Sequence, residues 1–255
     1  LPEHRRARAP FAEVYAYVRD RTPEVECYYT TIMGDNVAAQ RLLGRRRPGM
    51  PEYRPAGSYT TWCFRASMRS TRRGYELGRT SASEIKTLGH DLEPSMPLTQ
   101  EAWVWRDRAG DVVATAGVWD QRALRQYLVA GYAGSYRWAS RLPVHWLGYP
   151  RLPRVGAVAA QASVTQLWVR DWDRGLAFSF LDALARTHRR LDYLAWGAHD
   201  SHPLAGVLAG RSTAVTLRSL LYTVHFDDHC AGLSGAPVAL SAPGGTLISM
   251  PSRPM

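Results

Sequence analysis

The stretch 28–43 constrains the fold most, because its residues predict a buried strand that runs directly into a helix. Residues 25–33 are rich in Tyr, Thr, Val and Ile, which favour strands, and Gly34 and Asp35 end the run. Asp35 can cap the helix that follows, and Gly44 stands directly after that helix. A strand followed at once by a helix is typical of a mixed α/β fold.

Apolar periodicity and turn residues predict the other elements. Phe11, Val14, Tyr15 and Val18 recur at the spacing of one helical face. Two apolar runs around a polar turn predict a β-hairpin, because Gly110 supplies the backbone freedom that a tight turn needs. The remaining expected elements are strands at 53–63, 161–169, 191–196 and 216–226, a helix at about 176–190 and a short helix from residue 203.

The order of these elements indicates a duplicated unit. After residue 98 the expected order is hairpin, strand, turn, helix and strand, and part of this order also occurs before residue 64. The region between these two segments contains few regular apolar repeats. We expect an incomplete first domain at 1–64, a connector at 65–97, a second domain at 98–228 and a loosely ordered tail at 229–255. Strands that belong before Leu1 are expected to be absent from the chain.

The composition favours a protein that binds anions in a reducing compartment. The net charge is +10 and is carried almost wholly by arginine, since Lys86 is the only lysine. Nucleic-acid binding rests on this charge alone, because the sequence signatures of base-reading modules are missing. Three widely spaced cysteines argue against a disulfide framework and a cysteine zinc site, and no metal is expected. No apolar run reaches the ~18 residues of a membrane span, so we expect a cytoplasmic protein without membrane contact.

With Asn36 in the first turn of its helix, the segment 28–43 resembles the later half of a GCN5-related N-acetyltransferase (GNAT) domain. The whole chain resembles tandem GNAT-like proteins with an incomplete first copy. The resemblance implies tandem folds with mixed, mostly antiparallel sheets flanked by helices, and acetyl-CoA or another acyl-CoA as co-substrate. In this family the pyrophosphate sits on backbone amides at a helix start, in a turn with the pattern Arg/Gln-x-x-Gly-x-Gly/Ala.

The resemblance implies a cofactor site in the first copy. The segment 2–11 stands where the phosphate turn is expected and supplies Arg5, Arg6 and Arg8, although neither glycine of the pattern is present. The alternative for these arginines is a frayed basic N-terminus. Asn36 either contacts the pantetheine arm or caps its helix. Leu43 replaces the tyrosine with which the family often protonates the departing thiolate.

The corresponding turn of the second copy, at 171–176, departs further from the pattern. Only Gly175 remains of it, and Asp171 and Asp173 would repel a pyrophosphate. These aspartates fit better as an acidic cap of the following helix. We therefore expect this copy not to bind coenzyme A in the family's manner.

Candidate catalytic residues are few. His199 and Asp200 form the most reactive local group, together with Ser201 and His202, because imidazoles and a carboxylate can serve as base, acid or ligand. Capping of the short helix expected directly after them is the simpler explanation. Glu26, near the start of the first strand, is a further candidate base.

A mixture of aromatic residues and arginine occupies 126–154. Trp and Tyr beside Arg can build a pocket for a planar or extended ligand, or anchor an interface. Alternatively, these side chains cover the junction between the two copies.

Two functions are consistent with the sequence. The first is an acyl-CoA-dependent N-acyltransferase that moves an acetyl or other short acyl group to an amine, on a small molecule or a carrier, and that can form a homodimer. The second is a non-catalytic GNAT-like module that binds a protein or carrier partner.

Overall fold

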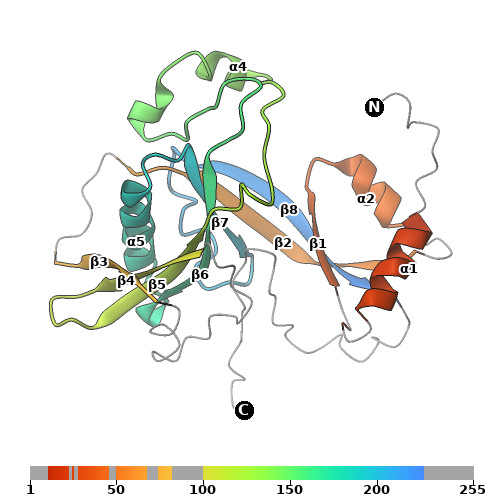
Figure 1. Cartoon of the computed structure of the whole chain (residues 1–255), viewed down its shortest axis with the longest axis horizontal. Helices are drawn as coiled ribbons and strands as arrows, with labels where there is room; N and C mark the ends of the chain where they lie inside the picture. The colour runs from red at the N-terminus through yellow and green to blue at the C-terminus, as the bar shows by residue number, and fades with distance from the viewer. Residues whose placement is uncertain are drawn as a thin grey trace, which may run out of the picture. The chain divides into compact units, whose positions relative to one another are not determined.

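The computed structural model describes residues 11–22, 25, 28–45, 50–67, 74–81 and 100–226 (Figure 1). The chain divides into two compact units. Unit 1 comprises 1–59 and 218–238, and unit 2 comprises 60–217 and 239–255. Helices accompany mostly antiparallel strands, so the expected mixed α/β class is confirmed.

Unit 1 contains the strand and the helix that the sequence predicts. Its elements are α1 (Phe11–Arg21), β1 (Tyr28–Met33), α2 (Val37–Leu43) and parts of β2 (Glu52–Phe64) and β8 (Val215–His225). β1 pairs antiparallel with β8, from Met33 opposite Ser219 onwards. The Asn36 side chain, rather than that of Asp35, caps α2, because its Oδ1 accepts a hydrogen bond from the backbone N–H of Ala39 at 3.1 Å. The strand and helix are confirmed, and of the two residues considered as a cap, Asp35 and Asn36, the structure shows Asn36.

Unit 2 is built on a sheet with the strand order β2-β7-β6-β5-β4-β3. The strands not yet placed are β3 (Glu76–Thr80), β4 (Gln100–Arg106), β5 (Val112–Trp119), β6 (Gln161–Val169) and β7 (Tyr193–His199). Neighbours from β3 to β6 pair antiparallel, whereas β6 and β7 are parallel. The predicted hairpin is β4–β5, whose turn has Gly110 at a φ of 88°. β3 lies within 65–97, so the expected connector contains a strand of the sheet.

Helix α5 (Arg174–Thr187) covers one face of this sheet and forms the core with it (Figure 1). Phe180, Leu181 and Leu184 of the helix are fully buried. Trp105 of β4 stacks on Phe180 with ring centroids 5.7 Å apart. Burial of a side chain of this size stabilises the fold by roughly 1.5–3 kcal/mol. This face of the sheet therefore forms the core of unit 2.

The connection between β5 and β6 leaves the sheet as a projection, which we call the arm (residues 120–160). Near the sheet its two chains run antiparallel, with Leu128 opposite Val158. Farther out lie α4 (Ser135–Ala139) and the 3-10 helix η2 (Val144–Leu147), and Figure 1 shows α4 at the outer end. The sequence predicts irregular chain here, and the structure adds short helical turns on a paired stalk.

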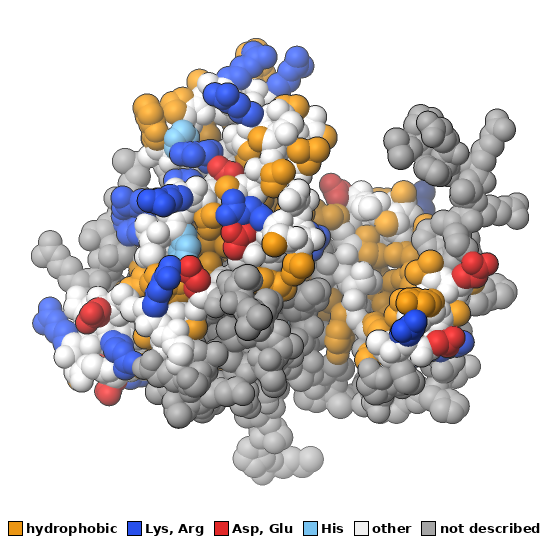
Figure 2. Space-filling model, in the orientation of Figure 1, with side chains coloured by type: hydrophobic (Ala, Val, Ile, Leu, Met, Phe, Trp, Pro, Cys, Tyr) orange, Lys and Arg blue, Asp and Glu red, His pale blue; other side chains and the backbone are white. Residues whose placement is uncertain are grey.

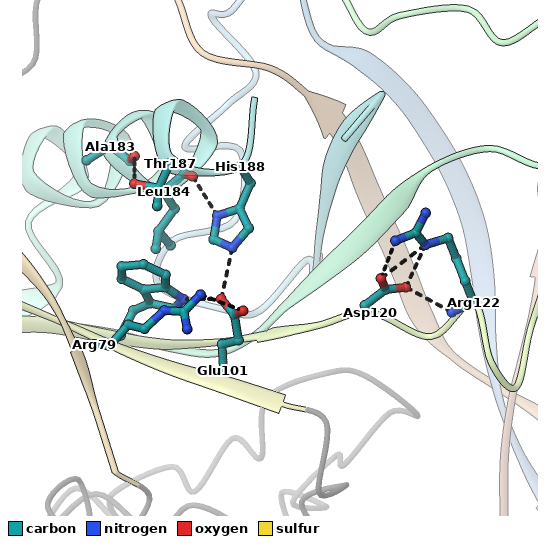
Figure 3. Close-up of polar contacts among 9 residues, drawn as sticks. Arg79, Glu101, Asp120, Arg122, Ala183, Leu184, Thr187 and His188 are labelled. Carbon is teal, nitrogen blue, oxygen red and sulfur yellow. Dashed lines mark hydrogen bonds and ion pairs between the residues drawn. The ribbon is translucent and has the colours of Figure 1, made fainter. Parts of the chain in front are cut away.

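Two carboxylates hold the base of the arm. The guanidinium of Arg122 binds Asp120 with Nε at 2.9 Å and Nη2 at 2.6 Å, and these hydrogen bonds lower the pKa of Asp120 (Figure 3). Asp192, at the start of β7, accepts the backbone N–H of Ala160 at 2.7 Å through Oδ2. The arm therefore leaves the sheet from a fixed base.

Residues 200–210 form a run of turns instead of the short helix expected from Pro203. The N–H of His202 donates to the carbonyl of His199, and the N–H of Ala205 donates to that of His202. Such i to i+3 bonds close single turns that do not continue as a helix. The prediction that Asp200 or Ser201 caps a helix is therefore wrong.

Candidate functional site

The structure leaves part of the predicted site untested. Arg5, Arg6, Arg8 and Glu26 lie outside the described residues. Asn36 is described, and its side-chain oxygen is engaged in the cap of α2. Of the two roles considered for Asn36, the structure shows the cap.

Strands β6 and β7 part at a defined point. Their parallel register runs from Gln161 opposite Tyr193 to Val164 opposite Trp196. β6 then continues to Val169 and β7 continues to His199, outside that register. The carboxyl ends of parallel strands that separate are the usual place for a ligand in a mixed sheet.

A β-bulge lies on β6 directly after this point. Thr165 is opposite Gly117 of β5 and Trp168 is opposite Thr115, so Gln166 and Leu167 together face one residue of β5. Gln166 has a φ of 50°, and its buried Oε1 has no hydrogen-bond partner. A bulge bends its strand and re-aims side chains, and an unsatisfied buried oxygen among the described residues marks a place where a ligand can donate.

The side chains of β6 on either side of the bulge point to two different faces of the sheet. Val164 before it and Leu167 after it both belong to the core against α5. Because side chains alternate along a strand, Ser163 and Trp168 point to the opposite face. On β7, Trp196 lies in the core, so His199 shares that opposite face. This second face carries polar groups beside the parting strands.

His199 ends β7 and is hydrogen-bonded on both ring nitrogens. Its Nδ1 lies 2.7 Å from the hydroxyl of Ser201 and accepts the backbone N–H of Ser201 at 3.2 Å. Its Nε2 lies 3.0 Å from Oδ1 of Asp200. Because Nδ1 accepts a backbone N–H, the neutral ring carries its hydrogen on Nε2 and donates it to Asp200. Nδ1 of His199 can therefore accept a proton from the hydroxyl of Ser201, which is an exposed residue.

His202 is a different case, because it is 5% exposed and packs between two tryptophans. Its ring lies 5.6 Å from that of Trp172 and 6.0 Å from that of Trp196. The N–H of Leu204 donates to Nδ1 of His202 at 3.0 Å. Through Trp172, His202 joins the carboxyl end of β6 to that of β7. Burial lowers the pKa of His202 to about 4, so the ring is neutral and structural.

This pKa predicts a loss of stability in acid. Folding lowers the pKa of His202 from its usual value to about 4, so the unfolded chain binds more protons between pH ~6.5 and ~4. The contribution of His202 is complete above pH ~6.5, and up to about 3 kcal/mol of it is lost as the pH falls to ~4. Urea unfolding across this range measures the slope. A His202→Asn variant keeps an acceptor for the N–H of Leu204, and it should flatten the slope; an unchanged slope would contradict the assignment.

The start of α5 does not fit a pyrophosphate. Oδ1 of Asp173 accepts the N–H of Gly175 at 2.7 Å and that of Leu176 at 2.9 Å, which are the amides an anion would use. Asp171 adds a second negative charge in the same turn. The expectation of an acidic cap is confirmed at Asp173, and the cap starts the helix at Arg174 rather than near residue 176. Arg170 also matches the first position of the phosphate pattern, which the sequence analysis missed.

Arg174 is an exposed cation at this end of the sheet. Its Nη2 lies 3.4 Å from the position that a Cβ on Gly206 would occupy, so the guanidinium extends over the turns that follow β7. The side chain of Arg174 is exposed. An exposed guanidinium at this position can attract an anionic group toward the turns that follow β7.

Two other groups do not belong to the site. Oε2 of Glu101 on β4 lies 3.2 Å from Nε2 of His188, and its Oε1 accepts Nη2 of Arg79 at 2.8 Å (Figure 3). Nδ1 of His188 faces the carbonyl of Leu184, so this cluster ties the end of α5 to the sheet. Burial raises the pKa of Cys63 to about 12, which leaves that thiol unreactive. Within the described ranges, no group of three or more His, Cys, Asp or Glu side chains could hold a metal ion.

Comparisons with known proteins give structural likeness only. No family model and no curated protein matches the chain. A GCN5-related N-acetyltransferase from Sphaerobacter thermophilus is 12% identical, with a TM-score of 0.48, over 88% of this chain and 70% of that one. A GCN5-related N-acetyltransferase from Anabaena variabilis is 12% identical, with a TM-score of 0.41, over 89% of this chain and 53% of that one, about half its length.

A tandem GNAT protein from the clavulanic acid biosynthesis pathway is also similar. It is 14% identical, with a TM-score of 0.48, over 89% of this chain and 72% of that one. These three solved structures are similar to this chain at 12–14% identity, with TM-scores of 0.41–0.48.

Proposed function

We propose that unit 2 is an acyl-CoA-dependent N-acyltransferase that moves an acetyl or other short acyl group to an amine. The observation that carries the proposal is the parting of the parallel strands β6 and β7 at the bulge. A pantetheine arm is extended and has amide groups, so it can lie between the parted strands much as a further strand would. The orphan Oε1 of Gln166 offers an acceptor for one of its amides.

The second face of the sheet supplies the proton chemistry. In acyl transfer the amine nitrogen bonds to the thioester carbon, the carbon–sulfur bond breaks, and the amine loses a proton while the thiolate gains one. His199 can take the amine proton at Nδ1 through the hydroxyl of Ser201, and Asp200 holds the ring in the required tautomer. His199, Asp200 and Ser201 all belong to the local group that the sequence indicates, and the proposed link is the hydroxyl of Ser201, 2.7 Å from Nδ1 of His199.

The phosphates of the donor need a place other than the start of α5. Asp173 occupies the amides of that helix start, whereas the exposed guanidinium of Arg174 extends over the turns that follow β7. Arg5, Arg6 and Arg8 remain proposed contacts for a cofactor in the first copy. We therefore expect binding in unit 2 to depend on side-chain charge rather than on a glycine-rich turn.

Ligand titration tests the proposal. Acetyl-CoA at about 100 times its dissociation constant should raise the thermal midpoint by roughly 5–10 °C, because a ligand that binds only the folded chain stabilises it. Arg174→Glu should weaken binding, while Arg106→Glu on the β4–β5 hairpin serves as a charge-matched control. If neither acetyl-CoA nor a longer acyl-CoA stabilises the chain, the acyltransferase proposal fails and a non-catalytic, partner-binding module takes its place.

A further inference from the structure

The outer part of the arm carries large apolar side chains that are mostly exposed. Trp138 is 69% exposed, Trp146 is 73%, and Leu142 and Leu147 are each 61%. All four lie on or beside α4 and η2, within ten residues of one another. Soluble proteins rarely expose apolar groups in such a contiguous set unless the set binds something.

Beyond Asp120 at its base, the arm carries charge of one sign. Residues 121–160 contain six arginines and neither aspartate nor glutamate. Arg141 lies over the ring of Trp138, with its Cζ 5.5 Å from the ring centroid, and Arg125 lies over Tyr127 at 4.9 Å. Figure 2 shows arginine and hydrophobic side chains side by side at the outer end of the arm, at the top of the view. The complement of this surface is anionic and has an apolar layer directly beneath its charge.

The shape of the arm distinguishes between possible partners. A protein partner would bind protruding tryptophans in preformed pockets, whereas a lipid surface accepts them at any position. The apolar side chains stand on short helical turns at the end of a paired stalk that leaves the sheet of unit 2. Tryptophan with arginine is typical of segments that lie at a membrane interface without crossing it.

We propose that the arm docks the protein reversibly on an anionic lipid surface. Trp138, Leu142, Trp146 and Leu147 enter the headgroup region, and Arg137 and Arg141 face the lipid phosphates. The sequence analysis expects no membrane contact because the chain lacks an apolar span, and no helix in the described ranges is long and apolar enough to cross a membrane. Peripheral docking requires no span.

Vesicle sedimentation with the full chain tests the proposal. The protein should sediment with vesicles of phosphatidylglycerol and phosphatidylcholine, should stay in solution with phosphatidylcholine alone, and should be released by salt. Arg137→Gln with Arg141→Gln should weaken binding about 25-fold, since each arginine near such a surface contributes about fivefold. Trp138→Ala with Trp146→Ala should weaken it about tenfold or more.

The matched control is Arg106→Gln with Arg108→Gln, which removes the same charge from the β4–β5 hairpin. This pair should leave vesicle binding within about twofold of wild type, and a thermal melt shows that each variant is folded. Equal binding by the arm variants and wild type would overturn the proposal. Absence of binding to anionic vesicles would also overturn it. In that case the arm either pairs two copies of the chain or binds an acidic protein. A dimer that is lost in the Trp138→Ala, Trp146→Ala variant would show the first of these.

Discussion

Replacing Asp182 with alanine is expected to lower the free energy of unfolding by about 3–5 kcal/mol, because it leaves a buried guanidinium without its counter-charge. Asp182 lies on α5 with a side chain that is 4% exposed, and Oδ1 is 3.3 Å from Nη1 of Arg211, whose side chain is equally buried. The same oxygen accepts the backbone N–H of Ser67 at 2.6 Å, and Oδ2 accepts Nε of Arg186 at 3.1 Å.

The position of Arg211 explains the size of this effect. Its guanidinium lies between the rings of Phe64 and Phe178, at 5.6 and 5.7 Å from their centroids. It also donates to the carbonyl of Arg65. Burial lowers the pKa of Arg211, and the nearby Asp182 opposes that shift. Without Asp182, a cation remains in an apolar position that water does not reach.

Chemical denaturation of three variants separates charge from packing. Asp182→Asn keeps an acceptor for Ser67 and should cost less than Asp182→Ala. The double variant Asp182→Leu, Arg211→Met removes both charges and should recover most of the loss. Asp111→Ala, at an exposed turn position, should stay within about 0.5 kcal/mol of wild type. A loss below about 1 kcal/mol for Asp182→Ala would show that the pair is not buried in solution.

His199→Ala is expected to lower kcat by about 10²–10⁴-fold if the chain transfers acyl groups, because it removes the proposed base. Release of free thiol from acetyl-CoA, measured with a panel of amines, reports the rate. Ser201→Ala should also lower kcat, since the proton then has no hydroxyl to pass through. KM for acetyl-CoA should change little in both variants, because neither side chain is proposed to hold the donor.

The pH profile separates a catalytic role from a structural one. The pH profile of kcat should differ between wild type and His199→Ala, because the variant lacks the proposed base. His145→Ala on η2 is the matched control and should keep both the rate and the profile. If His199→Ala retains wild-type kcat, the cluster at the end of β7 is only a turn.

Local sequence signals predict the elements better than they predict the site. The strand and helix of 28–43 and the β4–β5 hairpin follow from residues that are close in sequence. The bulge at Gln166 is set by pairing with β5, and nothing in the sequence of β6 marks it. The network of Asp182 joins Ser67 and Arg211 across long sequence separations, so no local pattern could indicate it.

The errors in the sequence analysis have physical causes. Proline at position 203 suggests a helix start, but single turns hold the chain around the buried His202. The sequence predicts Asp173 as a cap but places the helix start near residue 176. In the structure α5 begins at Arg174, directly after its cap. The cofactor site expected in the first copy stays a prediction, because Arg5, Arg6 and Arg8 lie outside the described residues. The parting of β6 and β7 depends on strand register, which the sequence does not encode locally.

The aspartate cap on α5 also has a thermodynamic consequence. Asp173 satisfies two amides at the helix start, so the first turn of α5 does not need a bound anion in order to form. Folding and occupancy of the site are then separate equilibria. In a protein whose phosphate turn orders only on binding, part of the binding free energy is spent on that ordering. In this chain, the stabilisation caused by a ligand would instead report the affinity of the ligand itself.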